Sequence, residues 1–141
     1  MKGKITLVED DPDILLSVNM ILEEAGYEVE PFTTPLPIIE DKYTVPDLFI
    51  LDKRTPDMDG LEVCKYLKSN DLTKNIPVII ISASPKFGSQ ALKAGAADFL
   101  AKPFQTATLL ALVRQHTETI TPAGDMSRIN PASLILLITF L

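Results

Sequence analysis

A continuous apolar run, Leu48 to Leu51, ends at Asp52, and this junction constrains the fold more than any other part of the chain. An apolar run without polar alternation is typical of a strand buried on both faces of a parallel sheet. Asp52 therefore stands where a buried strand ends and a turn begins. In open α/β sheets, ligands bind outside the carboxyl ends of the strands. A carboxylate at this point can act as a nucleophile or as a metal ligand.

Three further predicted strands end in the same manner, each at polar side chains with their own chemistry. They are residues 5–8, which lead into Glu9 and Asp10, residues 78–81, which lead into Ser82, and residues 98–101, which lead into Lys102 and Pro103. The carboxyl ends of parallel strands share one edge of a sheet. An acidic pair, a central aspartate, a hydroxyl and a lysine are therefore expected at a single site.

Helical patterns separate the apolar runs. They cover residues 12–24, 36–41, 61–69 and 87–94 and a last segment from residue 106, with Thr34 and Thr106 as predicted caps. One more short strand is predicted at residues 27–32. Five strand–helix units in succession predict an α/β fold, a doubly wound parallel sheet of strand order 2-1-3-4-5 with helices on both faces.

Composition narrows the classes of protein that fit. The chain has 141 residues and a formal net charge of −6, which suits one domain and argues against nucleic-acid binding through bulk charge. A single cysteine, Cys64, rules out an internal disulfide and leaves the cytoplasm as the expected compartment. The single histidine, His116, leaves no histidine-based metal cluster, and we expect it to cap a helix end or to be solvated.

Residues 120–141 differ in character from the rest of the chain. A linker-like segment leads to an almost wholly apolar stretch, residues 134–141, far shorter than the ~20 residues that a membrane helix needs. We expect one domain at residues 1–119, followed by a linker and an apolar tail that docks on its own domain or on a neighbouring chain. The alternative is that this stretch is an orphaned piece of a further segment.

The acidic pair, the central aspartate, the hydroxyl and the Lys-Pro pair follow one another in an order that resembles the receiver domain of response regulators. This family serves two-component signal transduction, and the resemblance covers about residues 1–118. It implies a flavodoxin-like, CheY-like fold. It also implies that Asp52 is the phosphoacceptor, forming an aspartyl phosphate with a phosphoryl group from a sensor histidine kinase or a phosphotransfer protein.

Aspartate is a poor nucleophile unless a cation neutralises the approaching phosphoryl oxygens. Mg²⁺ prefers oxygen ligands and keeps some of its waters. Glu9, Asp10 and Asp52 can supply carboxylate ligands, directly or through water, and the resemblance adds the backbone carbonyl of Arg54. The competing interpretation of the acidic residues is a solvated acidic turn without a ligand.

The resemblance assigns roles to three further side chains. The Ser82 hydroxyl would donate to the phosphoryl group, Lys102 would sense its charge across a cis bond to Pro103, and Phe99 would be the aromatic that rotates inward on activation. Each also has a simpler interpretation. Ser82 could cap the turn after its strand, Lys102 could be an ordinary surface lysine, and Phe99 could be a plain core aromatic.

The departures from the family pattern are Lys53 and Arg54, which are both basic where the family often has apolar residues. Arg54 lies two residues after Asp52, and Ser84 lies two residues after Ser82. In the family, these positions flank the path of the attacking water and tune dephosphorylation. A guanidinium at position 54 could steer phosphodonors or bind the partner, or it could be solvated.

The favoured function is a phosphorylation switch that changes the face at residues 86–112 and then dephosphorylates itself. Such a protein is a signalling domain, catalysing only its own phosphorylation and dephosphorylation, and it could form homodimers through this face or through the tail. It would contact neither nucleic acid nor membrane. The alternative is a haloacid-dehalogenase-type phosphatase, but that class needs a second aspartate where Arg54 stands. A third alternative, a bare flavodoxin-like binding module, would not require the charged residues Glu9, Asp10, Asp52 and Lys102.

Overall fold

Five parallel strands form the central sheet, in the order β2-β1-β3-β4-β5. The computed structural model describes residues 2–118, and the predicted linker and apolar tail lie outside the described residues. The strands are β1 (Lys4–Val8), β2 (Glu28–Phe32), β3 (Leu48–Asp52), β4 (Val78–Ser82) and β5 (Asp98–Ala101). Both the parallel sheet and its strand order confirm the prediction from the sequence.

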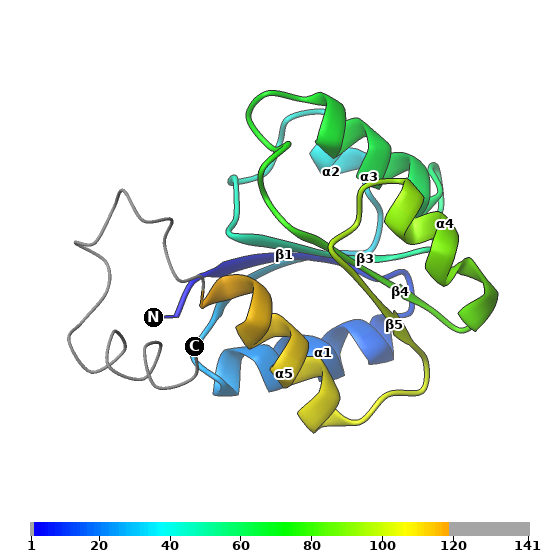
Figure 1. Ribbon diagram of the computed structural model, residues 1–141. Helices are drawn as coiled ribbons and strands as arrows, with labels where there is room; N and C mark the ends of the chain where they lie inside the picture. The colour runs from blue at the N-terminus through cyan, green and yellow to red at the C-terminus, as the bar shows by residue number, and fades with distance from the viewer. Residues whose placement is uncertain (1, 119–141) are drawn as a thin grey trace, which may run out of the picture.

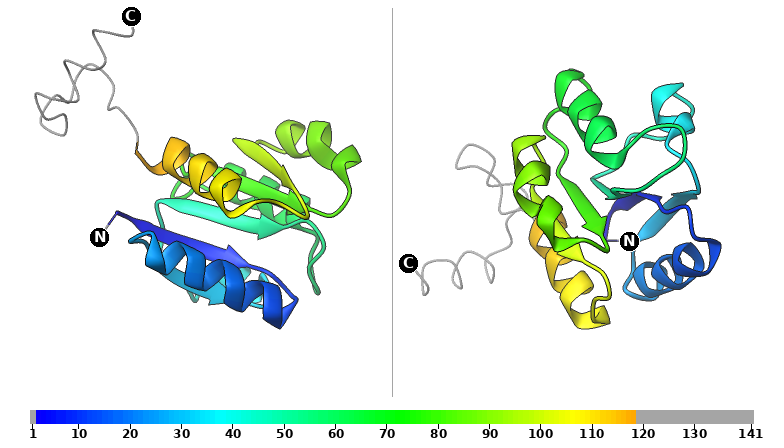
Figure 2. Two further views of the ribbon diagram at one scale, coloured as in Figure 1. Left: turned by 90° about the horizontal axis from the view of Figure 1, so that it is seen from below. Right: turned by 90° about the vertical axis from the view of Figure 1, so that its right-hand side faces the viewer.

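The helices cover both faces of the sheet. They are α1 (Pro12–Glu24), α2 (Leu36–Ile39), α3 (Gly60–Ser69), α4 (Gly88–Lys93) and α5 (Thr106–Thr117), with a short 3₁₀ turn η1 (Pro85–Phe87) before α4. Figure 1 shows α1 and α5 on one side of the sheet and α2, α3 and α4 on the other, and Figure 2 shows the same layers from two further directions. Among the helices of residues 2–118, none has the length and apolar character that crossing a membrane requires.

Two separate apolar cores explain why the sequences of β3 and β4 lack polar alternation. Every residue of β3 and β4 is buried, so both faces of these strands need apolar side chains. One core packs α2, α3 and α4 against the sheet and includes Cys64, a free thiol that is buried. The other packs α1 and α5 against the opposite face, through residues such as Leu22 and Leu109. The packed sheet therefore fixes the positions of the residues at the carboxyl ends of its strands.

Two predicted helix caps were wrong by one residue. Helix α2 is capped at Pro35, because the N–H groups of Ile38 and Ile39 bond to the Pro35 carbonyl, although the Thr34 hydroxyl still accepts from Leu36 N–H at 3.3 Å. Helix α5 has Gln105 as its cap residue, so Thr106 is already helical. The Leu109 N–H bonds to the Gln105 carbonyl, which fixes where the first turn begins. Local composition does not determine this backbone geometry.

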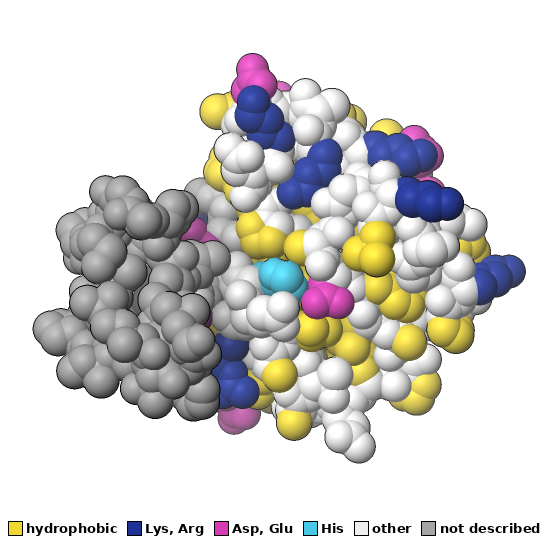
Figure 3. All heavy atoms as spheres, in the orientation of Figure 1, with side chains coloured by type: hydrophobic (Ala, Val, Ile, Leu, Met, Phe, Trp, Pro, Cys, Tyr) yellow, Lys and Arg dark blue, Asp and Glu magenta, His cyan; other side chains and the backbone are white. Residues whose placement is uncertain are grey.

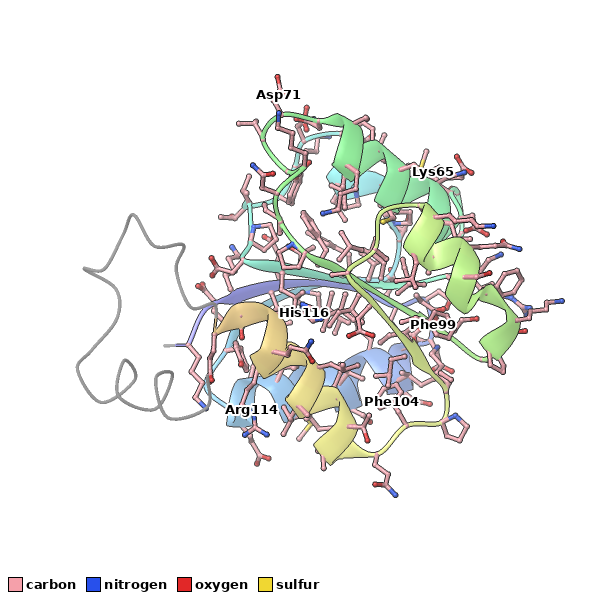
Figure 4. All side chains as sticks on the ribbon, viewed as in Figure 1. Lys65, Asp71, Phe99, Phe104, Arg114 and His116 are labelled. Atoms are coloured by element: carbon pink, nitrogen blue, oxygen red, sulfur yellow. The ribbon has the colours of Figure 1, made fainter. Side chains whose placement is uncertain are left out.

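The predictions for His116 were also wrong. Its Nε2 lies 3.2 Å from Oδ2 of Asp98, at the start of β5, and its side chain is mostly buried. Figure 4 labels His116 on α5 where the helix passes the sheet, and Figure 3 shows the histidine beside an acidic side chain on this face. The pair joins the end of α5 to β5. The two residues are 18 positions apart, so the local sequence does not predict their contact.

Candidate phosphoacceptor site

The carboxyl ends of β1, β3, β4 and β5 meet at one edge of the sheet and border a cleft of about 360 Å³. Most of the site residues predicted from the sequence line this cleft, and Phe99 is the exception. The lining residues are Glu9, Asp10, Asp11, Ile14, Asp52, Lys53, Arg54, Ser82, Ala83, Ser84, Phe87 and Lys102. The fold thus brings together side chains from four strand ends that span most of the chain.

Asp52 and Glu9 are buried beside one ammonium group. Asp52 is 5% exposed and Glu9 is 4% exposed. Lys102 Nζ donates to Oδ2 of Asp52 and to Oε1 of Glu9, both at 2.6 Å. The bond between Lys102 and Pro103 is cis, as the resemblance implied. A buried charge is costly unless it is paired, so the two carboxylates and the lysine depend on one another.

Burial raises the pKa of Glu9, and the nearby Asp52 carboxylate adds to the rise. Burial is the largest cause, the hydrogen bond and charge of Asp52 add to it, and Lys102 opposes it, so that the pKa rises from 4.5 to about 7. Burial lowers the pKa of Lys102, but the hydrogen bonds and charges of Asp52 and Glu9 outweigh burial and raise that pKa overall. The site therefore attracts additional positive charge near neutral pH.

Asp10 adds a third carboxylate at the exposed side of the same cluster. One carboxylate oxygen from each of Glu9, Asp10 and Asp52 lies within 4.8 Å of the others. Oxygen ligands of this kind and number suit Mg²⁺, which takes one or two carboxylates and fills its remaining positions with water and substrate oxygens. A cation would also relieve the repulsion among the three acids. These residues thus fit a divalent cation.

The loop after β3 folds tightly against Asp52. The backbone N–H of Arg54 donates to Oδ1 of Asp52 at 3.1 Å, and the Gly60 N–H donates to the Lys53 carbonyl at 2.8 Å. A Cβ added to Gly60 would lie 2.2 Å from the Asp52 carbonyl oxygen, so only glycine permits this approach. The loop thereby places Arg54 at the wall of the cleft.

Ser82, at the end of β4, and Ser84 also line the cleft. Ser82 is 5% exposed, and its hydroxyl oxygen accepts from the backbone N–H of Ser84 at 3.1 Å. The predicted cap of the turn after β4 is therefore present. Because a hydroxyl that accepts one bond keeps its own proton, Ser82 retains the capacity to donate toward the cleft.

Phe99 lies outside the cleft and packs on the side of the sheet that carries α3 and α4. Figure 4 shows Phe99 on this side, whereas Phe104 lies toward α1 and α5. The Phe99 ring lies close under Gly88, where an added Cβ would be 3.6 Å from ring carbon Cδ1. The packing fits both a core aromatic and an aromatic that moves with α4.

Five lining residues were not predicted as parts of the site, namely Asp11, Ile14, Lys53, Ala83 and Phe87. Asp11 caps α1 by accepting from Asp13 N–H at 2.9 Å, a role that the following Pro12 and helical pattern signal. Lys53 and Phe87 contact each other, with Lys53 Nζ 4.0 Å from the centroid of the Phe87 ring. They are 34 positions apart in the sequence, so no local pattern could have revealed this contact.

Comparison with known proteins identifies the family. Residues 5–114 match the family model of the response regulator receiver domain. The chain belongs to this family. Receiver domains are the signalling domains of two-component response regulators, and the sequence had predicted this membership from the order of the strand-end residues.

Curated relatives of this receiver domain are longer regulators. It is 34% identical over 132 residues to the DNA-binding dual master transcriptional regulator RpaA of Synechocystis, covering 89% of this chain and 55% of RpaA. It is 32% identical over 142 residues to the phosphate regulon transcriptional regulatory protein PhoB of Pseudomonas aeruginosa, covering 96% of this chain and 61% of PhoB. The chain therefore spans little more than half the length of these two relatives.

Solved receiver domains share the fold of this receiver domain. The receiver domain of the sensor histidine kinase PA1611 of Pseudomonas aeruginosa has a TM-score of 0.76 at 26% identity, covering 83% of this chain and 98% of that one. Its structure has a magnesium ion coordinated in the active site cleft. The chemotaxis response regulator CheY4 of Vibrio cholerae has a TM-score of 0.74 at 28% identity, covering 81% of this chain and 98% of that one.

Proposed function

We propose that this receiver domain is a phosphoacceptor switch in which Asp52 takes a phosphoryl group from the phosphohistidine of a sensor histidine kinase or a phosphotransfer protein. The observation that carries the proposal is the position of Asp52. Its carboxylate is buried at the end of β3, yet it lines a cleft together with Lys102 and the other two carboxylates. A nucleophile that must exclude competing water while admitting a phosphoryl group needs this combination.

In the transfer step, an Asp52 oxygen attacks phosphorus, a P–O bond forms, and the P–N bond to the donor imidazole breaks. The electron pair of the broken bond stays on the imidazole nitrogen. Transfer of this kind depends on positioning and on charge neutralisation, because the phosphoryl oxygens and the carboxylate repel each other. The Arg54 N–H and Lys102 Nζ fix the Asp52 carboxylate through both of its oxygens, 3.1 and 2.6 Å away respectively.

We infer that Glu9, Asp10, Asp52 and the carbonyl of Arg54 hold Mg²⁺. A bound Mg²⁺ would neutralise the phosphoryl oxygens and align them with the nucleophile. The three carboxylates within 4.8 Å of one another support this assignment, as does the magnesium ion in the cleft of the PA1611 receiver domain.

Lys102 and Ser82 would then read the modification. Lys102 is bonded to Asp52 and Glu9 before phosphorylation, and its ammonium would shift to the phosphoryl oxygens once Asp52 carries them. The Ser82 hydroxyl would donate a hydrogen bond to the same phosphoryl group. Movement of Ser82 would shift the segment that follows it, which leads to η1 and α4. Phe99 packs beneath this segment.

The readout surface in this proposal is the face formed by α4, β5 and α5. Leu92 is 59% exposed on α4, which leaves an apolar contact available on this face. A second copy of the chain or an output partner would bind there in one of the two states.

Hydrolysis of the acyl phosphate on Asp52 returns the domain to its starting state. Water bonds to phosphorus, the P–O bond to Asp52 breaks, and phosphate leaves while one proton passes to solvent.

The phosphatase alternative receives no support from the cleft. A second acidic residue two positions after the nucleophile would be its acid and base, and Arg54 lines the cleft at that place. Turnover of a generic phosphate ester would favour the phosphatase. A single base-labile phosphoryl group on the protein would favour the switch.

Intact-mass analysis after incubation with Mg²⁺ and a small phosphodonor, such as acetyl phosphate, tests the proposal. The wild-type chain should gain one phosphoryl group, and Asp52→Asn should gain none. Asp57→Asn is a matched control, because Asp57 is an exposed acid in the same loop with a left-handed φ of 70°, which asparagine tolerates. Labelling of Asp52→Asn to the wild-type level would refute the assignment.

A further inference from the structure

Lys53, the residue after Asp52, joins two loops that border the cleft. Its Nζ lies 2.7 Å from Oδ2 of Asp59 and 4.0 Å from the centroid of the Phe87 ring. Asp59 belongs to the loop after β3, where its other oxygen accepts from Leu61 N–H and caps α3. Phe87 ends turn η1 after β4. One ammonium group therefore contacts a carboxylate on one loop and an aromatic face on the other.

The base of the Lys53 side chain is fixed. Its backbone N–H donates to the Ile81 carbonyl at 2.7 Å, and its carbonyl accepts from Gly60 N–H at 2.8 Å. The side chain is only 19% exposed, so the ion pair with Asp59 and the contact with the ring are partly shielded from water. Phe87 is thus held by a group that is itself anchored to β4 and α3.

The segment that carries Phe87 has weak local ties. Within the described chain, neither η1 nor α4 has a side-chain cap, and the Phe87 N–H reaches the Ser84 carbonyl at a long 3.3 Å. On its inner side, the next residue, Gly88, packs on Phe99. The contact between Phe87 and Lys53 ties this segment to the β3 side of the cleft.

We propose that Lys53 is a positioning residue that latches η1 against the loop after β3, and that this latch limits the rate at which water reaches the acyl phosphate on Asp52. The effect on hydrolysis of the acyl phosphate rests on the proposed function. When Phe87 leaves the ammonium, the wall of the cleft that both residues line opens beside Asp52. Water then attacks phosphorus, the P–O bond breaks and phosphate leaves.

Amide hydrogen exchange of residues 84–88 in the unphosphorylated chain tests the latch. A cation over an aromatic ring contributes about 0.5–1 kcal/mol at partly exposed sites, so Lys53→Met should speed this exchange roughly two- to five-fold. Phe87→Leu should give the same change, and the double variant should exceed neither single variant. Lys53→Arg should retain the wild-type rate, because a guanidinium also pairs with carboxylate and stacks on the ring.

Lys86→Met is the matched control. Lys86 Nζ lies 5.2 Å from the same ring centroid, but Lys86 is the neighbour of Phe87 on one turn, and within residues 2–118 it forms no ion pair with a second loop. Its exchange rates should equal those of the wild type. An equal increase in Lys86→Met, or unchanged exchange in Lys53→Met and Phe87→Leu, would overturn the latch. Should Lys53→Met fail to fold, Phe87→Leu gives the same test, since it keeps the ion pair with Asp59.

The phosphorylated chain supplies the second readout. After removal of the phosphodonor, Lys53→Met and Phe87→Leu should lose phosphate faster by the same factor as their exchange rates rise, while Lys53→Arg and Lys86→Met should match the wild type. Faster exchange with an unchanged rate of phosphate loss would overturn the link to hydrolysis. If the wild type takes up no phosphoryl group, the proposed function and the hydrolysis half both fail, and the exchange measurement alone still decides the latch.

Discussion

Replacing Glu9 with glutamine should remove a pH dependence that the cleft imposes on folding in metal-free buffer. The pKa of Glu9 is raised from 4.5 to about 7, chiefly by burial. The folded chain therefore holds this proton more tightly than the unfolded chain does. The stabilisation is complete below pH 4.5 and is lost as the pH rises through 7. Stability should thus fall across this interval and level off above it.

The magnitude follows from the size of the shift. A rise from 4.5 to about 7, at roughly 1.4 kcal/mol per pH unit, corresponds to about 3.5 kcal/mol in the free energy of unfolding. The wild-type chain should therefore lose up to about 3 kcal/mol between pH 5 and pH 8 relative to Glu9→Gln. Lys102 stays charged across this range, because its pKa is raised, and it contributes no slope of its own there.

Urea denaturation in the presence of a chelator measures this difference at pH 5, 6, 7 and 8. Glu24→Gln is the control, since Glu24 is an exposed acid at the end of α1 and its removal should leave the wild-type slope intact. Equal slopes in the wild type and in Glu9→Gln would refute the claim that the buried acid near Lys102 sets the pH dependence. Added Mg²⁺ should restore wild-type stability at pH 8.

Three further outcomes follow from the same site. Asp10→Ala should weaken Mg²⁺ binding in a calorimetric titration and should leave or slightly raise the melting temperature without metal, because one like charge is removed. Lys102→Ala should still accept a phosphoryl group by intact mass, yet show no response of the α4–β5–α5 face in NMR shifts. Gly60→Ala should destabilise the fold by more than about 2 kcal/mol in thermal or urea unfolding, because its Cβ would lie 2.2 Å from the Asp52 carbonyl oxygen.

The sheet and the ends of its strands could be predicted because they depend on local sequence. Strands buried on both faces require uninterrupted apolar runs, and β3 and β4 supply them. Parallel pairing then places the residues that follow each strand at one edge, which is why Asp52, Ser82 and Lys102 were expected together. Their chemical roles came from resemblance to the family, and they stay predictions until they are measured.

Contacts between distant side chains could not be predicted in this way. The pairing of His116 with Asp98 depends on how α5 lies against β5, and the contact of Lys53 with Phe87 depends on the path of two loops. The predictions of the helix caps were wrong for a related reason. Thr106 is a good cap by composition, but the backbone begins its first turn at Gln105, and hydrogen bonds rather than residue preference decide that point.

The most direct test of the switch compares backbone NMR spectra of the wild-type chain with Mg²⁺, before and after addition of a small phosphodonor. We expect shifts at the cleft and also along α4, β5 and α5, which return to their starting positions as phosphate is released. Asp52→Asn under the same conditions should show neither change. Labelling of the wild type with shifts confined to residues around Asp52 would refute the switch function, because phosphorylation would then leave the α4–β5–α5 face unchanged.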